Sequence, residues 1–133
     1  MDTALLVMFP LEAGRKLVQK LEKSGFEVQA AFWNYNVSLD EWRLMIASPY
    51  VESSGTLKAY QKVNALLPEV TSEVNSLVNQ IYMENVTVVK PSNDLIRALR
   101  ETIRVDASDE PVWLHRTYRG DQYIDQAYIY LMN

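Results

Sequence analysis

Residues 26–47 read FEVQAAFWNYNVSLDEWRLMIA, two stretches of alternating side chains that a polar break separates. In residues 26–35 the aromatic, β-branched and small side chains favour a strand over a helix. Residues 41–47 alternate again, and Pro49 ends the second strand because proline cannot donate to a strand ladder. The break at residues 36–40 has the length of a hairpin loop. The sequence therefore predicts an antiparallel hairpin.

An amphipathic helix is predicted before this hairpin, between Pro10 and Ser24, and Gly25 is placed as its carboxyl-terminal stop. The apolar run at residues 4–9 either extends this helix or forms a separate short strand. The start of the chain is acidic, and the run is too short for a secretory signal or a membrane span, so we expect a cytoplasmic protein. The apolar face of the helix is Leu11, Leu17, Val18 and Leu21.

Three further helices are expected after the hairpin. Ser53 or Ser54 caps the first, which Pro68 terminates. The second follows Thr71 or Ser72, and its apolar face is Val74, Leu77, Val78 and Ile81. Ser92, Asn93 or Asp94 caps the third, whose apolar face is Leu95, Ile96, Leu99 and Ile103 and whose opposite side carries Arg97, Arg100, Glu101 and Arg104.

A short buried strand is predicted at residues 86–89, and a closing hairpin pairs residues 112–119 with residues 122–131 across Gly120-Asp121. The element order is then α-ββ-α-α-β-α-ββ. This order predicts one α+β domain over residues 1–133, with a mostly antiparallel sheet of four to five strands and helices packed on one face. Leu99, at the centre of the third helix, should point into the main core.

The amino-acid composition excludes several kinds of functional site. The chain has 133 residues, a formal charge of −4 and no cysteine. Such a length can bury a stable core without a disulfide or a metal, and the absence of thiols excludes zinc-thiolate, iron–sulfur and cysteine-nucleophile sites. The four glycines are too scattered for a nucleotide-binding loop. No pattern specifies a reaction, and we expect no cofactor.

Two stretches carry a likeness to known sequences: Gly25-Phe26 through Ala30-Ala31-Phe32-Trp33-x-Tyr35 to Glu41-Trp42-Arg43-Leu44-x-Ile46-Ala47-Ser48-Pro49, and the ending Tyr123-Ile124-Asp125-x-Ala127-Tyr128-Ile129-Tyr130. They resemble a family of small uncharacterised bacterial and prophage-type proteins. The resemblance implies a bacterial protein with a helix, an aromatic hairpin and a closing strand. Because no activity is known for that family, the resemblance implies no catalytic residue.

Aromatic residues are the strongest compositional feature, with three Trp, eight Tyr and three Phe, most of them on predicted strands. Cross-strand packing explains such residues in most proteins. If helices cover only one face of the sheet, however, some of these rings lie near solvent, where an aromatic patch marks a partner surface. The leading hypothesis is therefore a protein-interaction domain, homodimeric or bound to another protein, that uses a sheet edge or the aromatic surface of Trp33, Tyr35, Tyr128 and Tyr130.

An enzyme is the first alternative. His115 is the only histidine, so a general base would be this residue or a carboxylate. A metal-dependent phosphoesterase or nuclease would use Mg²⁺ held by carboxylates near loops. Turn chemistry and packing explain the same residues without any metal, and we assign no metal ligand. The candidates are Asp40, Glu41, Asp121 and Asp125, with His115.

A second alternative rests on arginines. Arg97, Arg100 and Arg104 recur at spacings of three and four, which places them on one side of a predicted helix. Such a row suits phosphate or nucleic-acid contacts, although solvated charge on a helix surface looks the same. The acidic balance of the chain argues against a nucleic-acid partner.

Overall fold

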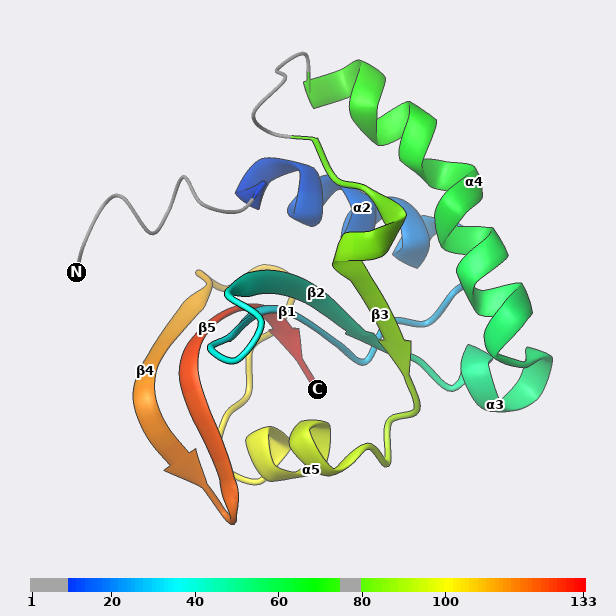
Figure 1. Ribbon diagram of the computed structural model, residues 1–133. Coiled ribbons are helices and arrows are strands. Elements are labelled where there is room, and N and C mark those ends of the chain that lie inside the picture. The colour runs from blue at the N-terminus through cyan, green and yellow to red at the C-terminus, as the bar shows by residue number, and fades with distance from the viewer. Residues whose placement is uncertain (1–9, 75–79) are drawn as a thin grey trace.

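The computed structural model describes residues 10–74 and 80–133 (Figure 1). The uncertain run at residues 4–9, and Leu77 and Val78 of the second expected helix, lie outside the described residues. The elements in chain order are helix α2 (Leu11–Lys23), strands β1 (Ala30–Asn36) and β2 (Glu41–Ala47), helices α3 (Tyr50–Ser54) and α4 (Thr56–Val74), the 3-10 turn η2 (Met83–Asn85), strand β3 (Val86–Val89), helix α5 (Asp94–Arg100), and strands β4 (Val112–Arg119) and β5 (Gln122–Met132).

These strands form one five-stranded sheet in the order β3-β2-β1-β5-β4. Both predicted hairpins are present, and β1 also pairs antiparallel with β5. Only β3 runs parallel to its neighbour β2, and helices α3 and α4 provide the long connection that parallel strands require. The α+β class and the mostly antiparallel sheet are as predicted.

Helix α2 ends at the glycine that the sequence indicated. Gly25 has a φ of 80°, its N–H donates to Glu22 O at 3.2 Å, and the N–H of Phe26 donates to Leu21 O at 3.1 Å. This pair of hydrogen bonds is a Schellman motif, in which a left-handed residue satisfies the last helical carbonyls. Phe26 therefore packs back on the helix, and β1 begins at Ala30 rather than at Phe26 as predicted.

The sequence predicted that a helix ends at Pro68, but α4 (Thr56–Val74) contains this proline. A short α3 ends at Gly55, whose φ of 89° breaks the helical path. Helix α4 then continues through Pro68, which is exposed. Proline removes one helical hydrogen bond, but buried Leu67 and Val70 on either side of Pro68 continue the apolar stripe. Packing of that stripe holds the helix across the proline. The expected caps at Ser53, Ser54, Thr71 and Ser72 lie inside α3 and α4.

Helices cover both faces of the sheet, which corrects the prediction of helices on one face. Helices α2 and α4 lie on one side and α5 on the other (Figure 1). Asn93 caps α5 by accepting from the N–H groups of Leu95 and Ile96 at 3.0 and 3.3 Å. Leu99 is completely buried, as predicted, but it lies in the smaller of two cores rather than in the main one.

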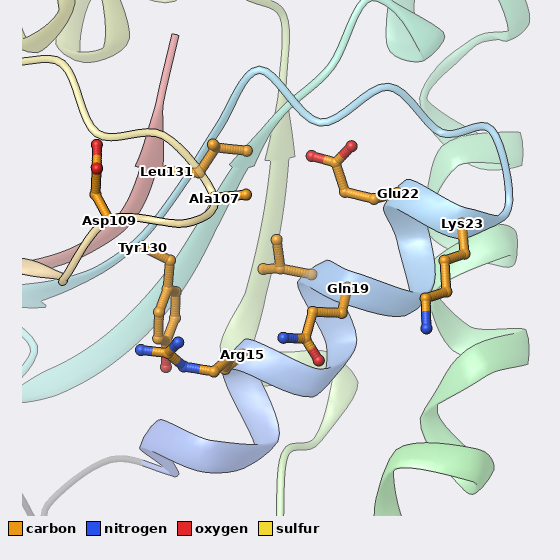
Figure 2. A pocket seen from close by; sticks show the side chains of 9 residues that line it. Arg15, Gln19, Glu22, Lys23, Ala107, Asp109, Tyr130 and Leu131 are labelled. Carbon is orange, nitrogen blue, oxygen red and sulfur yellow. The ribbon is translucent and has the colours of Figure 1, made fainter.

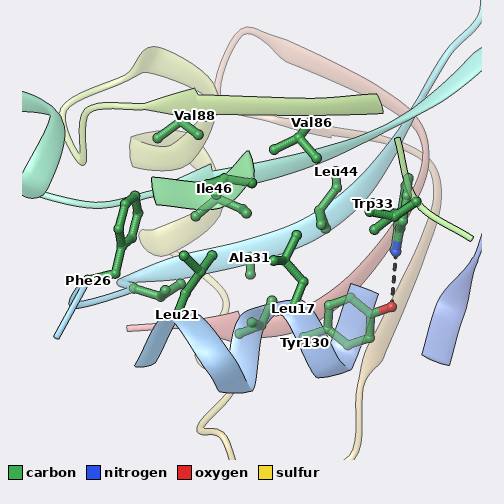
Figure 3. Packing of buried hydrophobic residues seen from close by; sticks show 14 of the residues in the cluster. Leu17, Leu21, Phe26, Ala31, Trp33, Leu44, Ile46, Val86, Val88 and Tyr130 are labelled. Carbon is green, nitrogen blue, oxygen red and sulfur yellow. Dashed lines mark hydrogen bonds between the residues drawn. The ribbon is translucent and has the colours of Figure 1, made fainter. Parts of the chain in front are cut away.

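Two hydrophobic cores therefore flank the sheet. The larger core lies between the sheet and helices α2 and α4, and Figure 3 shows Leu17 and Leu21 of α2 against the sheet residues. Within it, the indole N–H of Trp33 donates to the hydroxyl of Tyr130 at 3.0 Å. The smaller core, beneath α5, is Ala30, Phe32, Ala47, Ile96, Leu99, Val105, Leu114, Ile124, Ala127, Ile129 and Met132.

Candidate functional site

The aromatic residues predicted as a solvent-facing surface are mostly internal. Trp33 is 0% exposed, Tyr128 8% and Tyr130 6%, whereas Tyr35 is half-buried. Trp33 and Tyr130 point toward α2 and belong to the larger core. The expectation that these rings lie near solvent was wrong for these three residues, because helices occupy both faces of the sheet.

Other aromatic side chains contact one another across the curled sheet. Strands β2 and β4 are separated by β1 and β5, yet the ring centres of Trp42 and Trp113 lie 6.3 Å apart, in an edge-to-face arrangement. The ring of Trp113 also contacts that of Tyr128, with 4.9 Å between ring centres, and stacks on that of His115, with 5.6 Å between ring centres. These four residues form what we call the aromatic cluster. Trp42, Trp113 and Tyr128 of this cluster pack with the larger core, as expected of cross-strand packing.

Tyr35, Asp40 and Glu41 meet in a pocket of about 270 Å³ at the end of the first hairpin, together with Pro10, Trp33, Trp42 and Asn85. The hydroxyl of Tyr35 donates to Asp40. This hydrogen bond raises the pKa of Tyr35, and burial and the charges of Asp40 and Asp125 raise it further. Glu41 accepts from the Nε of Arg43 at 3.1 Å. Both pocket carboxylates thus already have partners.

The other predicted catalytic residues do not line this pocket, although the charge of Asp125 acts on Tyr35. Asp121 is in the β4–β5 turn, Asp125 is on β5, and His115 is exposed on β4. Among residues 10–74 and 80–133, no three His, Cys, Asp or Glu side chains are grouped as a metal site would require.

The three predicted anion-binding arginines do not share a helix face. Helix α5 ends at Arg100, so Arg104 lies beyond it. The chain leaves the helix because Val105 pairs with Met132 of β5, with hydrogen bonds of 3.0 and 2.8 Å. Arg100 donates to Pro91 O at 2.9 Å, and exposed Arg97 lies beside Glu101 in a shallow depression. The proposed arginine row therefore does not form.

The two edges of the sheet differ. Edge strand β3 has four residues, and the N–H of Val88 donates to the hydroxyl of Tyr60 on α4 at 3.0 Å. Edge strand β4 has eight residues. Within the described part of the chain, no residue outside β4 and β5 hydrogen-bonds to its backbone. Strand β4 is thus an edge of the sheet with which no other described strand pairs on its outer side, and such an edge is a template for another strand.

Strand β4 also has features that the sequence analysis missed. Arg116 has a φ of 40°, a left-handed conformation that is uncommon for arginine and that interrupts pairing with β5. Beyond it, Tyr118 and Tyr123 pair across the hairpin at 5.1 Å and are 67% and 50% exposed. Their symmetric positions around Gly120-Asp121 were a usable signal for this pair. No sequence signal indicated the conformation of Arg116.

Comparisons with protein-family models, with curated proteins and with solved structures found no match to this chain. Among the described residues, no helix is both long and apolar enough to cross a membrane.

Proposed function

We propose that the protein is an interaction domain that forms a homodimer by antiparallel pairing of the β4 edges. One observation carries this proposal: Tyr60 covers the β3 edge, whereas nothing in the described part of the chain hydrogen-bonds to the outer side of β4. An unpaired edge strand gains a full ladder of backbone hydrogen bonds from a second strand. Strand β4 supplies such an edge, because it is rich in aromatic and β-branched residues, which favour strands.

A second copy is the partner that this edge fits best. A two-fold axis places any strand antiparallel to its own copy, so the chain needs no separate complementary segment. The segment from Val112 to His115 is regular and carries no formal charge, whereas Arg116 and Arg119 follow the left-handed break. Charged residues and kinks are the features that discourage pairing of edge strands. The first half of β4 is therefore the pairing segment.

Charge-swap variants at His115 test this proposal, because the residue is exposed and belongs to the pairing segment. His115→Asp and His115→Lys each bring two like charges, one from each copy, into the paired segment. Each variant alone should dimerise roughly threefold to tenfold more weakly than the wild-type chain. An equimolar mixture of the two variants should recover dimers, since opposite charges then face each other. Sedimentation equilibrium measures all of these states.

The matched controls are Asn64→Asp and Asn64→Lys, on the exposed side of α4. These variants should sediment as the wild-type chain does. A wild-type chain that sediments as a monomer of 15.3 kDa at about 100 μM, well above a micromolar dissociation constant, would refute the homodimer. So would variants at His115 that dimerise with unchanged affinity.

A further inference from the structure

A groove of about 250 Å³ runs between helix α2 and the loop that precedes β4, with β5 beneath it (Figure 2). Its apolar surface comes from Val18 of α2, Ala107 of the loop, and Leu131 and the ring of Tyr130 on β5. The hydroxyl of Tyr130 donates to Leu11 O and accepts from Trp33, so it belongs to the core. The groove therefore offers mainly apolar contact along its length.

Opposite charges stand at the two ends of this groove. Arg15, Gln19 and Glu22 lie along one side of α2, and Figure 2 shows Arg15 beside Tyr130 and the Glu22 carboxylate turned toward Ala107 and Leu131. Arg15 and Glu22 are seven residues apart, which is about 10 Å along a helix axis. An extended peptide of three residues spans about the same length.

In the described residues neither Arg15 nor Glu22 forms an ion pair, although Lys23 also lines the groove. The guanidinium of Arg15 lies 5.8 Å from the ring centre of Tyr130, and Arg15 forms no ion pair in residues 10–74 and 80–133. Burial raises the pKa of Glu22, and the nearby charge of Glu27 raises it further. A bound cation would lower that pKa again, because it stabilises the charged carboxylate. Asp109, on the opposite wall, accepts from the N–H of Asp106 at 2.8 Å and so stabilises its own turn.

We infer that the groove binds a small zwitterion with an apolar body, about the length of a tripeptide, with its carboxylate at Arg15 and its ammonium group at Glu22. The apolar body would lie on Val18, Ala107 and Leu131. A guanidinium held over an aromatic ring is well suited to a carboxylate. This site is separate from the β4 edge, so its test does not depend on the proposed homodimer.

The tripeptide Ala-Leu-Ala and two capped forms test the inference, with binding followed by NMR titration of the wild-type chain. Acetylation of its amino end removes the ammonium charge, and amidation of its carboxyl end removes the carboxylate. Each capped form should bind roughly two- to fivefold more weakly than the free peptide, the effect expected of one exposed ion pair.

Two variants assign each charge to its end of the groove. Arg15→Gln should bind the free and amidated peptides equally, and Glu22→Gln should bind the free and acetylated peptides equally. The matched controls Arg97→Gln and Glu101→Gln, on exposed residues of the α5 region, should behave as the wild-type chain does. The inference is wrong if Ala-Leu-Ala shows no saturable binding up to about 10 mM, or if the capped forms bind the wild-type chain as tightly as the free peptide.

Discussion

At the scale of single residues, Gly14 sets how closely helix α2 approaches the sheet. A Cβ atom at this position would lie 2.6 Å from the Nε1 of Trp33 and 2.7 Å from the hydroxyl of Tyr130. These two atoms are hydrogen-bonded to each other inside the larger core. The absence of a side chain at residue 14 thus lets the helix backbone pass directly over this hydrogen bond.

We predict that Gly14→Ala destabilises the protein by roughly 1 to 3 kcal/mol, the usual cost of overpacking a core. Alanine favours a helix over glycine by about 1 kcal/mol. At a position with room for a methyl group, the same substitution would therefore stabilise the protein. Urea unfolding measures the difference. In a Tyr130→Phe background the penalty should be smaller, because the hydroxyl that a methyl group would meet is gone. A Gly14→Ala chain more stable than the wild-type chain would contradict this account.

At the scale of elements, helix α5 is important because it closes the second face of the sheet. Ile96 and Leu99 are completely buried there against Phe32 and Ile129 of the sheet. The helix is only seven residues long, too short to be stable in isolation. Its stability therefore comes from the Asn93 cap and from this packing.

We expect Leu99→Ala to cost roughly 2 to 5 kcal/mol, since neighbouring side chains only partly fill the cavity. Arg97→Ala is the control, because Arg97 is exposed while Arg100 donates to Pro91 O. The control should change the free energy of unfolding by no more than about 0.5 kcal/mol. Equal urea midpoints for Leu99→Ala and the wild-type chain would show that α5 does not cover a core.

An ion pair joins helices α2 and α4. Glu73 pairs with Lys20 and lies 4.0 Å from the Nζ of Lys16. The hydrogen bond from Lys20 lowers the pKa of Glu73 below its ordinary 4.5, and the same bond raises the pKa of Lys20 above its ordinary 10.5. The folded state thus favours the charged form of both groups. The pair stabilises the protein between these two pKa values.

Glu73→Gln should consequently lower the urea midpoint slightly at pH 7, and the difference from the wild-type chain should disappear as acid protonates Glu73. It should also shrink at alkaline pH, as Lys20 loses its proton. Glu69→Gln, on an exposed residue of the same helix that acts on Lys20 by charge alone, should show a smaller difference at neutral pH. A Glu73→Gln effect that does not change with pH would mean that the ion pair is not its cause.

Local sequence signals predicted most elements. The failures have a common cause, which is contact between residues that are distant in the sequence. Gly25 and Asn93 mark helix ends through hydrogen bonds to nearby residues, so their roles are readable from the sequence. Pro68 was misread because packing between distant residues holds α4 together across it. The end of α5 at Arg100 depends on Val105 pairing with Met132, a contact that no local pattern reveals.

At the scale of the whole molecule, the curl of the sheet determines which aromatic side chains contact one another. It brings Trp42 and Trp113 together from strands that are not neighbours. The sequence predicted that Tyr35, Asp40 and Glu41 lie near one hairpin, and the structure places them in one pocket. The sequence did not indicate that Trp33 is internal or that β4 is an edge strand of the sheet, because both depend on strand order and on helices covering both faces.

Hydrogen exchange at the backbone amides of β4 tests the homodimer most directly. In residues 112–115, amides that do not pair with β5 should exchange slowly at high protein concentration and faster on dilution, as the second strand leaves. The amide of Val88, which donates to Tyr60, is the internal reference and should not respond to dilution. Rapid exchange of the outward amides of β4 at every concentration would contradict pairing at this edge.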